Sequence, residues 1–397
     1  MSWIKHTGAR YHTQDTGYYC GAACAMMILN EIGVPYADLD QDDLYTSNHT
    51  HNAVPGDGWY TDPYGLRYTL VDRRPASFTN TFVVHKPLTE VEGTRDIVYT
   101  LWRYGVSPSV LVFGCAHWIV VPGVQTNVEP ATGATYTVEG FWVHNPVFKD
   151  NEPHSATDSC GNGGTDGNAN EFVTYLGWQT TYLTGCAYDS PGGERQYISV
   201  CDPDERSLEL PRRRPIERRF QERRLLTPAE AQEAAQAELR GYRLHEDKRV
   251  KERLANAQPT APIPVLRLDR LNSYYYLVPW GTDAGVGASA QVDARTGLLH
   301  GLNLHQDPVR KQVLARKNVL AKLAGQRFEM KDKRGRMGRF TLFPETACLS
   351  PFLVWRPCQE SWSPHLPFYQ ITVGDHRIYV RLDGEVFTHL TIEGKGM

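Results

Sequence analysis

A polar, glycine-containing loop that leads directly into an apolar helix constrains the fold of this chain more than any other stretch. It spans residues 14–33, QDTGYYCGAACAMMILNEIG. From Cys20 onward the apolar residues recur at helical spacing, and Gly33 is suited to end the helix. Cys20 is therefore expected in the first turn of a buried helix. There, unpaired backbone N–H groups and the positive end of the helix dipole favour the thiolate, the nucleophilic form of cysteine.

Gln14 lies in the loop before Cys20, and Gly17 between them lets the loop fold back. We expect the Gln14 side-chain amide to lie beside the sulfur, where it can donate to an oxyanion formed during acyl transfer. The alternative is that Cys20 is a small hydrophobic core residue, as cysteines on apolar helices usually are. Cys24, one turn further along the helix, fits that description.

Two later strands are expected to supply the partners of a cysteine nucleophile. A strand that opens at His117 and a strand over residues 134–145 flank the turn-forming sequence Pro-Ala-Thr-Gly, which predicts a β-hairpin. With the turn centred on that sequence, His117 falls opposite Asn145, whose side-chain oxygen can then accept from the imidazole and orient it. A slip of one residue in the register would place the two side chains on opposite faces. The alternative role for His117 is a core histidine at a strand start.

Three motifs together resemble papain-like cysteine peptidases, most closely the C39-like branch. They are Q-x5-C-G-A-A at a helix start, H-W-I-V-V-P-G-V, and W-V-H-N-P, and the resemblance covers about residues 1–202. It implies that Cys20 attacks a carbonyl and that His117 transfers the proton to the leaving amine. Gln14 and the Cys20 backbone N–H would then stabilise the oxyanion.

Asn145 departs from the C39-like pattern, in which an aspartate precedes the proline, and matches papain itself in having asparagine. An asparagine orients the imidazole but carries no charge to stabilise the imidazolium, so activity is expected to be lower. His144 faces away from Asn145 on the strand and is the second candidate for the base.

The length of 397 residues favours two domains, and an arginine-rich segment at residues 203–226 separates two regions of ordinary composition. Its core, PRRRPIERRFQERR, carries seven arginines and two glutamates and is broken by prolines. It predicts a solvated linker or basic helix face. The alternatives are docking on an acidic surface, of a partner or of residues 38–62, and, less favoured, nucleic-acid binding, since interleaved aromatic residues are missing.

Residues 227–397 are predicted to form two helix-plus-sheet repeats. Thr227-Pro228-Ala229-Glu230 is a capping box, and a second helix is expected from Asp307-Pro308 to Gly325. The pieces YYYLVPW…AQVDARTGLLHGL and PFYQITV…IYVRLDGEVFTHL resemble PepSY-like modules, which accompany peptidases as inhibitory or substrate-handling parts. An unrelated α+β domain is the alternative.

Composition excludes few function classes. A net charge of −3 gives no overall argument for binding nucleic acid or membrane, and no apolar run reaches the length of a membrane span. The N-terminus lacks the apolar core of a signal peptide, so we expect a cytoplasmic protein whose eight scattered cysteines are free thiols. No cofactor is expected. The sequence His49-Thr50-His51, near Asp57 and Asp62, could bind a metal ion, but the surrounding glycines, proline and polar residues favour a surface loop.

The sequence thus predicts an α+β protein with an N-terminal papain-like domain. Its expected function is that of a cysteine peptidase acting on a protein or peptide, with a C-terminal domain that regulates access or recruits substrate. Two alternatives remain open. The same site can serve an acyltransferase in which an amine replaces water, or the fold can be a catalytically idle binding module that meets a protein partner through the basic linker or the C-terminal domain.

Overall fold

The structure is a computed structural model that combines helices with mostly antiparallel strands, so the predicted α+β class is confirmed. It describes residues 2–54, 58–147, 168–201, 208–214, 224–282, 285–305, 316–331, 336–343, 350–392 and 394–396. The chain forms two compact units. Unit 1 comprises residues 1–217, 299–306 and 393–397, and unit 2 comprises residues 218–298 and 307–392. A strand from the middle of the chain and its last residues therefore belong to unit 1, although the predicted domain 227–397 contains both.

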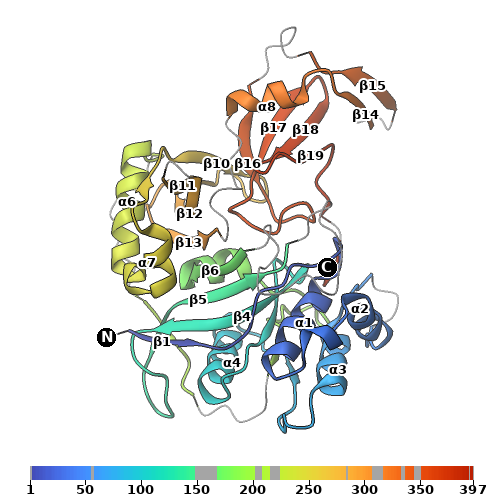
Figure 1. Cartoon of the computed structure of the whole chain (residues 1–397), viewed down its shortest axis with the longest axis vertical. Coiled ribbons are helices and arrows are strands. Elements are labelled where there is room, and N and C mark those ends of the chain that lie inside the picture. Colours follow the sequence, from blue (N-terminus) through green and yellow to red (C-terminus); the bar gives the residue numbers. More distant parts are fainter. Residues whose placement is uncertain are drawn as a thin grey trace. The chain divides into compact units, whose positions relative to one another are not determined.

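Helix α1 (Cys20–Glu31) begins at the predicted cysteine and is buried over its first ten residues. It ends as the sequence indicates, with Gly33 at a φ of +111°. The Gly33 N–H donates to the Asn30 carbonyl and the Val34 N–H donates to the Leu29 carbonyl, which is the Schellman arrangement. The helix packs against α2, α3 and strand β4 (Figure 1).

The surface loop expected around His49 and His51 is wrong, because this stretch belongs to a helix, although much of it is exposed as expected. Helix α2 (Gln41–Thr50) is capped by the Asp40 side chain, and α3 (Pro63–Arg73) is capped by Asp62 with Pro63 in its first turn. Each aspartate accepts from backbone N–H groups that a helix start leaves unpaired. The histidine pair at residues 49–51 consequently lies at the end of α2.

A mixed sheet forms the centre of unit 1 (Figure 1), and its strands run in the order β2-β7-β3-β4-β5-β6-β13. Strand β1 lengthens the β3 edge of β4, and β8 pairs in parallel with β5. Helix α4 (Glu90–Arg103), whose apolar residues recur at near-helical spacing, packs against β4 and β7. The strands of unit 1 are β1 (Trp3–His6), β2 (Val83–His85), β3 (Ser109–Val112), β4 (His117–Thr126), β5 (Thr137–Asn145), β6 (Asn168–Thr174), β7 (Ser199–Cys201), β8 (Arg212–Arg213) and β13 (Leu299–Leu304).

The aromatic residues after β6 favour a strand, but the chain there turns into α5 (Tyr175–Gly177) and a π-helical turn (Trp178–Tyr182). The Thr174 hydroxyl caps this turn, so local capping overrides the strand preference of the aromatic residues. Within the basic segment 203–226, Arg212–Arg213 forms the short strand β8, and Arg212 is exposed. Residues 202–207 and 215–223 lie outside the described part.

Unit 2 contains helices α6 (Pro228–Gly241), α7 (Lys248–Leu254) and α8 (Arg316–Leu323). Its sheet runs in the order β12-β11-β10-β16-β17-β18-β19, and the parallel pair β10–β16 joins the two predicted repeats into one sheet. A separate hairpin pairs β14 with β15. The predicted helix start at Asp307-Pro308 lies outside the described residues. The strands of unit 2 are β9 (Gln258–Pro259), β10 (Ile263–Arg267), β11 (Tyr274–Thr282), β12 (Gly285–Asp293), β14 (Arg327–Lys331), β15 (Met337–Thr341), β16 (Phe352–Trp355), β17 (Phe368–Val373), β18 (His376–Arg381) and β19 (Val386–Phe387).

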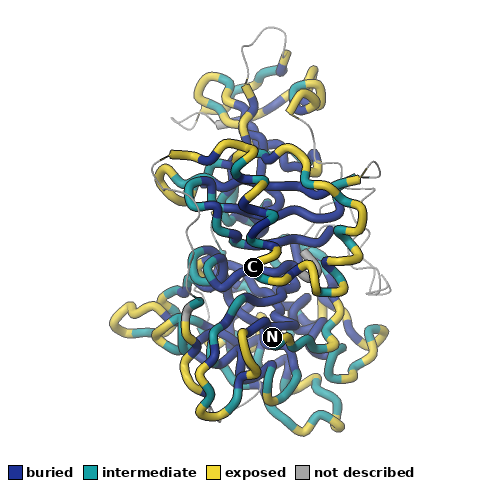
Figure 2. Tube along the Cα trace, turned by 90° about the vertical axis from the view of Figure 1, so that its left-hand side faces the viewer, coloured by how far each residue is buried: buried dark blue, intermediate teal, exposed yellow. Residues whose placement is uncertain are grey.

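Burial follows the strands in both units, and exposed residues gather at turns and helix surfaces (Figure 2). Strand β4 is buried along its entire length. The core of unit 1 surrounds α1, so the cysteine at the start of that helix lies in the interior. Among the described residues, no helix has the length and apolar content that a membrane span needs.

Candidate active site

Cys20 is the first residue of α1, and its sulfur lies against the start of β4. The Trp118 backbone N–H donates to Cys20 Sγ over 3.2 Å, and the Gly21 N–H is a second backbone donor to the sulfur. In the part of the chain that the structure describes, no side chain caps this helix start, which follows Tyr19. The Cys20 side chain is fully buried.

Burial decides the ionisation of Cys20. Loss of solvent raises the pKa of the thiol well above its usual value, and neighbouring Cys24 adds to the rise. The Trp118 and Gly21 N–H groups lower the pKa but do not offset burial. The expectation of a thiolate is therefore wrong for the chain as folded, because a helix start stabilises an anion less than water removal destabilises it.

His117 and Asn145 are brought together as predicted. His117 Nε2 and Asn145 Oδ1 are 2.8 Å apart, and both side chains are fully buried. If Nε2 carries the proton, its N–H donates a hydrogen bond to the asparagine oxygen, and Nδ1 is the basic nitrogen of the ring. The ring of Phe113 stacks on the imidazole at 6.3 Å between centroids.

The register of the hairpin differs from the predicted one. Val120 pairs with His144, so continuing this register places His117 opposite residue 147 and not opposite Asn145. Asn145 is then the diagonal neighbour of His117 on the same face of the sheet. Because the shift equals two residues, the period of side-chain alternation, it keeps the two side chains on one face.

Gln14 is buried, and its Nε2 donates to the Thr16 carbonyl over 2.8 Å. Within the described residues, its Oε1 atom has no hydrogen-bond partner. One N–H of the amide is therefore engaged within the loop, and the second is the one that an oxyanion would need. The predicted oxyanion role of Gln14 stays a prediction.

The two alternative residues lie where the sequence indicates. His144 Nε2 is 3.1 Å from the Ala9 carbonyl, and its ring meets Tyr11 edge-on, on the face of β5 opposite Asn145. Cys24 is fully buried in α1, and burial raises the pKa of its thiol. Cys24 is thus a core residue.

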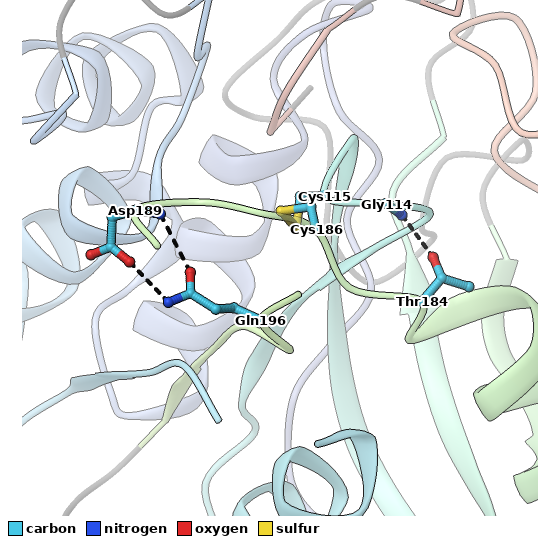
Figure 3. Close-up of a disulfide and its surroundings, with 6 residues drawn as sticks. All are labelled: Gly114, Cys115, Thr184, Cys186, Asp189 and Gln196. Atoms are coloured by element: carbon cyan, nitrogen blue, oxygen red, sulfur yellow. Dashed lines mark hydrogen bonds between the residues drawn. A yellow bond between two sulfur atoms is a disulfide. The ribbon is translucent and has the colours of Figure 1, made fainter. Parts of the chain in front are cut away.

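A disulfide joins Cys115 to Cys186 close to the candidate site (Figure 3), so the expectation of free thiols is wrong for this pair. It fixes the turn between β3 and β4, where Phe113, Gly114 and Cys115 all have positive φ. The same turn is held by the Gly114 N–H, which donates to Thr184 Oγ1 over 2.8 Å. Disulfides are rare in a reducing cytosol, and the pair therefore runs against the cytoplasmic expectation.

Thr61, which is not among the predicted site residues, lies beside Gly21, the residue that follows Cys20. Its side chain covers Gly21 so closely that a Cβ there would lie 2.5 Å from Thr61 Cγ2. Its carbonyl accepts from the Trp118 indole N–H over 2.9 Å. The glycine that follows Cys20 is the one sequence signal that points to such a close approach. In the parts of the chain that the structure describes, no cluster of three or more His, Cys, Asp or Glu side chains is placed to hold a metal ion.

No protein-family model and no curated protein matches this chain. Among solved structures, it is similar to the "Bacillus megaterium YpeB C-terminal domain", with 7% sequence identity over 78% of this chain and 100% of that chain. The TM-score is 0.17, which carries no argument about fold or function. The papain-like, C39-like and PepSY-like resemblances therefore stay predictions from the sequence.

Proposed function

We propose that this protein is a cysteine peptidase that hydrolyses a peptide or isopeptide bond through Cys20, His117 and Asn145. One observation carries the proposal: β4 opens with a histidine whose Nε2 is paired with an asparagine oxygen, and the next residue donates its backbone N–H to the cysteine sulfur. A nucleophile, a base and a group that orients the base are the parts that acyl transfer requires. Here they converge from α1, β4 and β5.

The chemistry follows from these roles. His117 Nδ1 takes the thiol proton as Cys20 Sγ attacks the carbonyl carbon, and the carbonyl oxygen becomes an oxyanion. Gln14 and the Cys20 backbone N–H donate to that oxyanion. The carbon–nitrogen bond then breaks as the imidazolium gives its proton to the leaving amine, and water, deprotonated by His117, releases the acyl group and restores the thiol.

The proposal extends to the second unit and to partners. Substrates are expected to be proteins or peptides, with unit 2 regulating access or recruiting them. The fully buried, protonated Cys20 gives weight to a second candidate, an idle papain-like module that binds a partner without chemistry. An acyltransferase on the same site is the third.

The deciding experiment follows cleavage of a mixed pool of unstructured peptides by mass spectrometry, with the purified chain and with Cys20→Ala. We expect new termini only with the unchanged cysteine and a rate lower by at least about a thousandfold in Cys20→Ala. Cys24→Ala is the matched control, since it removes a cysteine from the same helix one turn away, and its rate is expected to stay the same.

The remaining outcomes separate the candidates. Adding a primary amine such as glycinamide and finding an amide adduct in place of a free carboxylate would favour the acyltransferase. Equal product formation with and without the Cys20→Ala change, both in the full chain and in a chain ending at Ile392, would contradict all chemistry at Cys20. That result, together with iodoacetamide labelling of Cys20 no faster than of Cys24 in the chain ending at Ile392, would favour the idle module.

A further inference from the structure

The last described residues of the chain lie against Thr61 and Cys115, which border the candidate site of unit 1. Lys395 bridges in parallel to Trp59, and the Lys395 carbonyl accepts from the Tyr60 N–H over 3.1 Å. The Thr61 N–H donates to the Gly396 carbonyl over 3.2 Å. Residues 394–396 therefore lie along the 59–61 segment as an added strand, near the start of α1 (Figure 1).

Gly396 also reaches the opposite wall of the site. Its N–H donates to the Cys115 carbonyl over 2.9 Å, and Cys115 belongs to the turn that leads into His117. One residue thus connects Thr61, which covers the helix start beside Cys20, with the turn ahead of the candidate base. The segment spans the site between its two walls.

The seat of Gly396 accepts only glycine. Its φ is +63°, a conformation that side chains disfavour. A Cβ at this position would lie 2.0 Å from the Thr61 carbonyl oxygen and 3.1 Å from Trp118 Nε1. The close fit explains how the segment enters so narrow a space, and it makes the contact breakable by a single substitution.

The Lys395 side chain makes a second contact, with the ring of Trp59. Its Nζ lies 5.7 Å from the centroid of the buried Trp59 ring, within reach of a cation–π interaction. The Lys395 side chain itself is exposed, so its charge stays in water while its backbone pairs. Backbone hydrogen bonds and one glycine therefore hold the segment, with little apolar anchoring.

We propose that residues 394–396 are an internal lid that seals Cys20 in the folded chain, occupying the groove that a substrate backbone would use. This rests on the proposed function only in naming the sealed group as the nucleophile. Three backbone hydrogen bonds hold the lid, and displacing it opens the site. The full burial of Cys20 is then a property of the closed state.

The test measures the rate at which iodoacetamide labels Cys20 in the native protein, mapped by peptide mass spectrometry. A chain ending at Ile392 and the variant Gly396→Val are expected to label at least about tenfold faster than the full chain. Gly133→Ala is the matched control, because Gly133 also has a positive φ, of +73°, but has no atom within 4 Å of an added Cβ. Its labelling rate is expected to equal that of the full chain.

Faster labelling could also arise because the shortened chain folds less well. A peptide supplied in trans distinguishes this case from loss of the lid. The peptide Thr-Ile-Glu-Gly-Lys-Gly-Met, residues 391–397, is expected to restore protection of Cys20 in the chain ending at Ile392, and the same peptide with valine for its second glycine is not. Equal labelling of the full and shortened chains would overturn the lid, as would labelling that rises equally at the core residue Cys24.

Measuring peptide cleavage on the same samples separates the two proposals. Faster labelling without cleavage supports the lid and contradicts the peptidase. Cys20-dependent cleavage at the same rate in the full and shortened chains supports the peptidase and contradicts the lid.

Discussion

The first turns of α1 and α6 both leave backbone N–H groups without partners inside the helix, and the two helices use these groups differently. At α6 the Thr227 hydroxyl accepts from the Glu230 N–H, the Glu230 carboxylate accepts from the Thr227 N–H, and Arg224 pairs with that carboxylate. At α1 no side chain caps the helix, and the Gly21 N–H points to the Cys20 sulfur. The donors at α6 hold a capping carboxylate and hydroxyl, and the donor at α1 is directed at a buried cysteine sulfur.

The largest expected effect comes from breaking the α1 site. His117→Ala should lower the peptidase rate at least about a thousandfold, because the thiol loses its proton acceptor. Asn145→Ala should lower it about tenfold to a hundredfold, since the imidazole keeps its basicity but loses its orientation. Rates of peptide cleavage across the two variants check the order, and Thr227→Ala is the control that should leave them unchanged. An Asn145→Ala rate equal to that of the native chain would remove the orienting role.

The second effect concerns the covalent link next to the α1 site. The Cys115–Cys186 bond closes a separation of 71 residues, which corresponds to about 4 kcal/mol of unfolding free energy in the chain-entropy description. Replacing both cysteines by serine should lower the stability of unit 1 by up to that amount, measured by urea denaturation. Cys201→Ser, which changes a buried cysteine of the same unit outside this disulfide, is the comparison. A midpoint unchanged in the double variant would mean that the link adds nothing.

The pH dependence of stability should have opposite signs at Asp96 in unit 1 and at Glu230 in unit 2. Burial raises the pKa of Asp96, on α4 of unit 1, from 3.8 to about 7. A group with a raised folded pKa stabilises the fold fully below its unfolded value, and this stabilisation is lost as the pH rises toward 7. The native chain should therefore lose unfolding free energy as the pH rises from about 4 to 7. Asp96→Asn should reduce this loss by up to about 4 kcal/mol, as measured by urea denaturation at both pH values.

Glu230 at the start of α6 should behave in the reverse manner. The Arg224 side chain and then the Thr227 N–H lower its pKa from 4.5 to about 2. Its contribution is present above pH 4.5 and is lost as the pH falls toward 2. Unfolding curves of Glu230→Gln at pH 7 and pH 3 check the sign: the variant should differ from the native chain at pH 7 and approach it at low pH.

The smallest effect tests the cap alone. Thr227→Ala should lower stability by about 1 kcal/mol, the typical value for a threonine N-cap. Thr227→Ser keeps the hydroxyl and should restore most of it. Urea denaturation of the pair measures the difference, and two coincident curves would show that Glu230 and Arg224 hold the helix start without the hydroxyl.

The sequence specified those parts of the fold that depend on local patterns. Helix α1, its end at Gly33 and the hairpin β4–β5 follow from periodicity and turn residues. The start of helix α3 has the same cap signal as α6, since Asp62-Pro63 corresponds to Thr227-Pro228. The weak amphipathic pattern of α3 is why the sequence does not predict this helix. The pairing of His117 with Asn145 survived an error in register because strand faces repeat every two residues.

The features that escaped prediction arise from residues far apart in the chain. The surroundings of Cys20 include Trp118 and Thr61, which no spacing rule connects to α1. The Cys115–Cys186 link joins two loops whose proximity is a product of the completed fold. The ionisation of the thiol was misjudged for that reason, since the helix start is local information and the loss of water is not.

The insertion of β13 into the sheet of unit 1 bears on how the protein can be divided for experiment. The chain passes between its units at 217/218, 298/299, 306/307 and 392/393, so neither unit is one continuous stretch. A recombinant fragment that stops at Glu217 would lack the strand that pairs with β6 at Val173 and Phe172. Its unpaired backbone N–H and C=O groups would offer a template for aggregation. Expression as a single polypeptide, or a fusion that carries residues 299–304 back to that edge, is what the topology calls for.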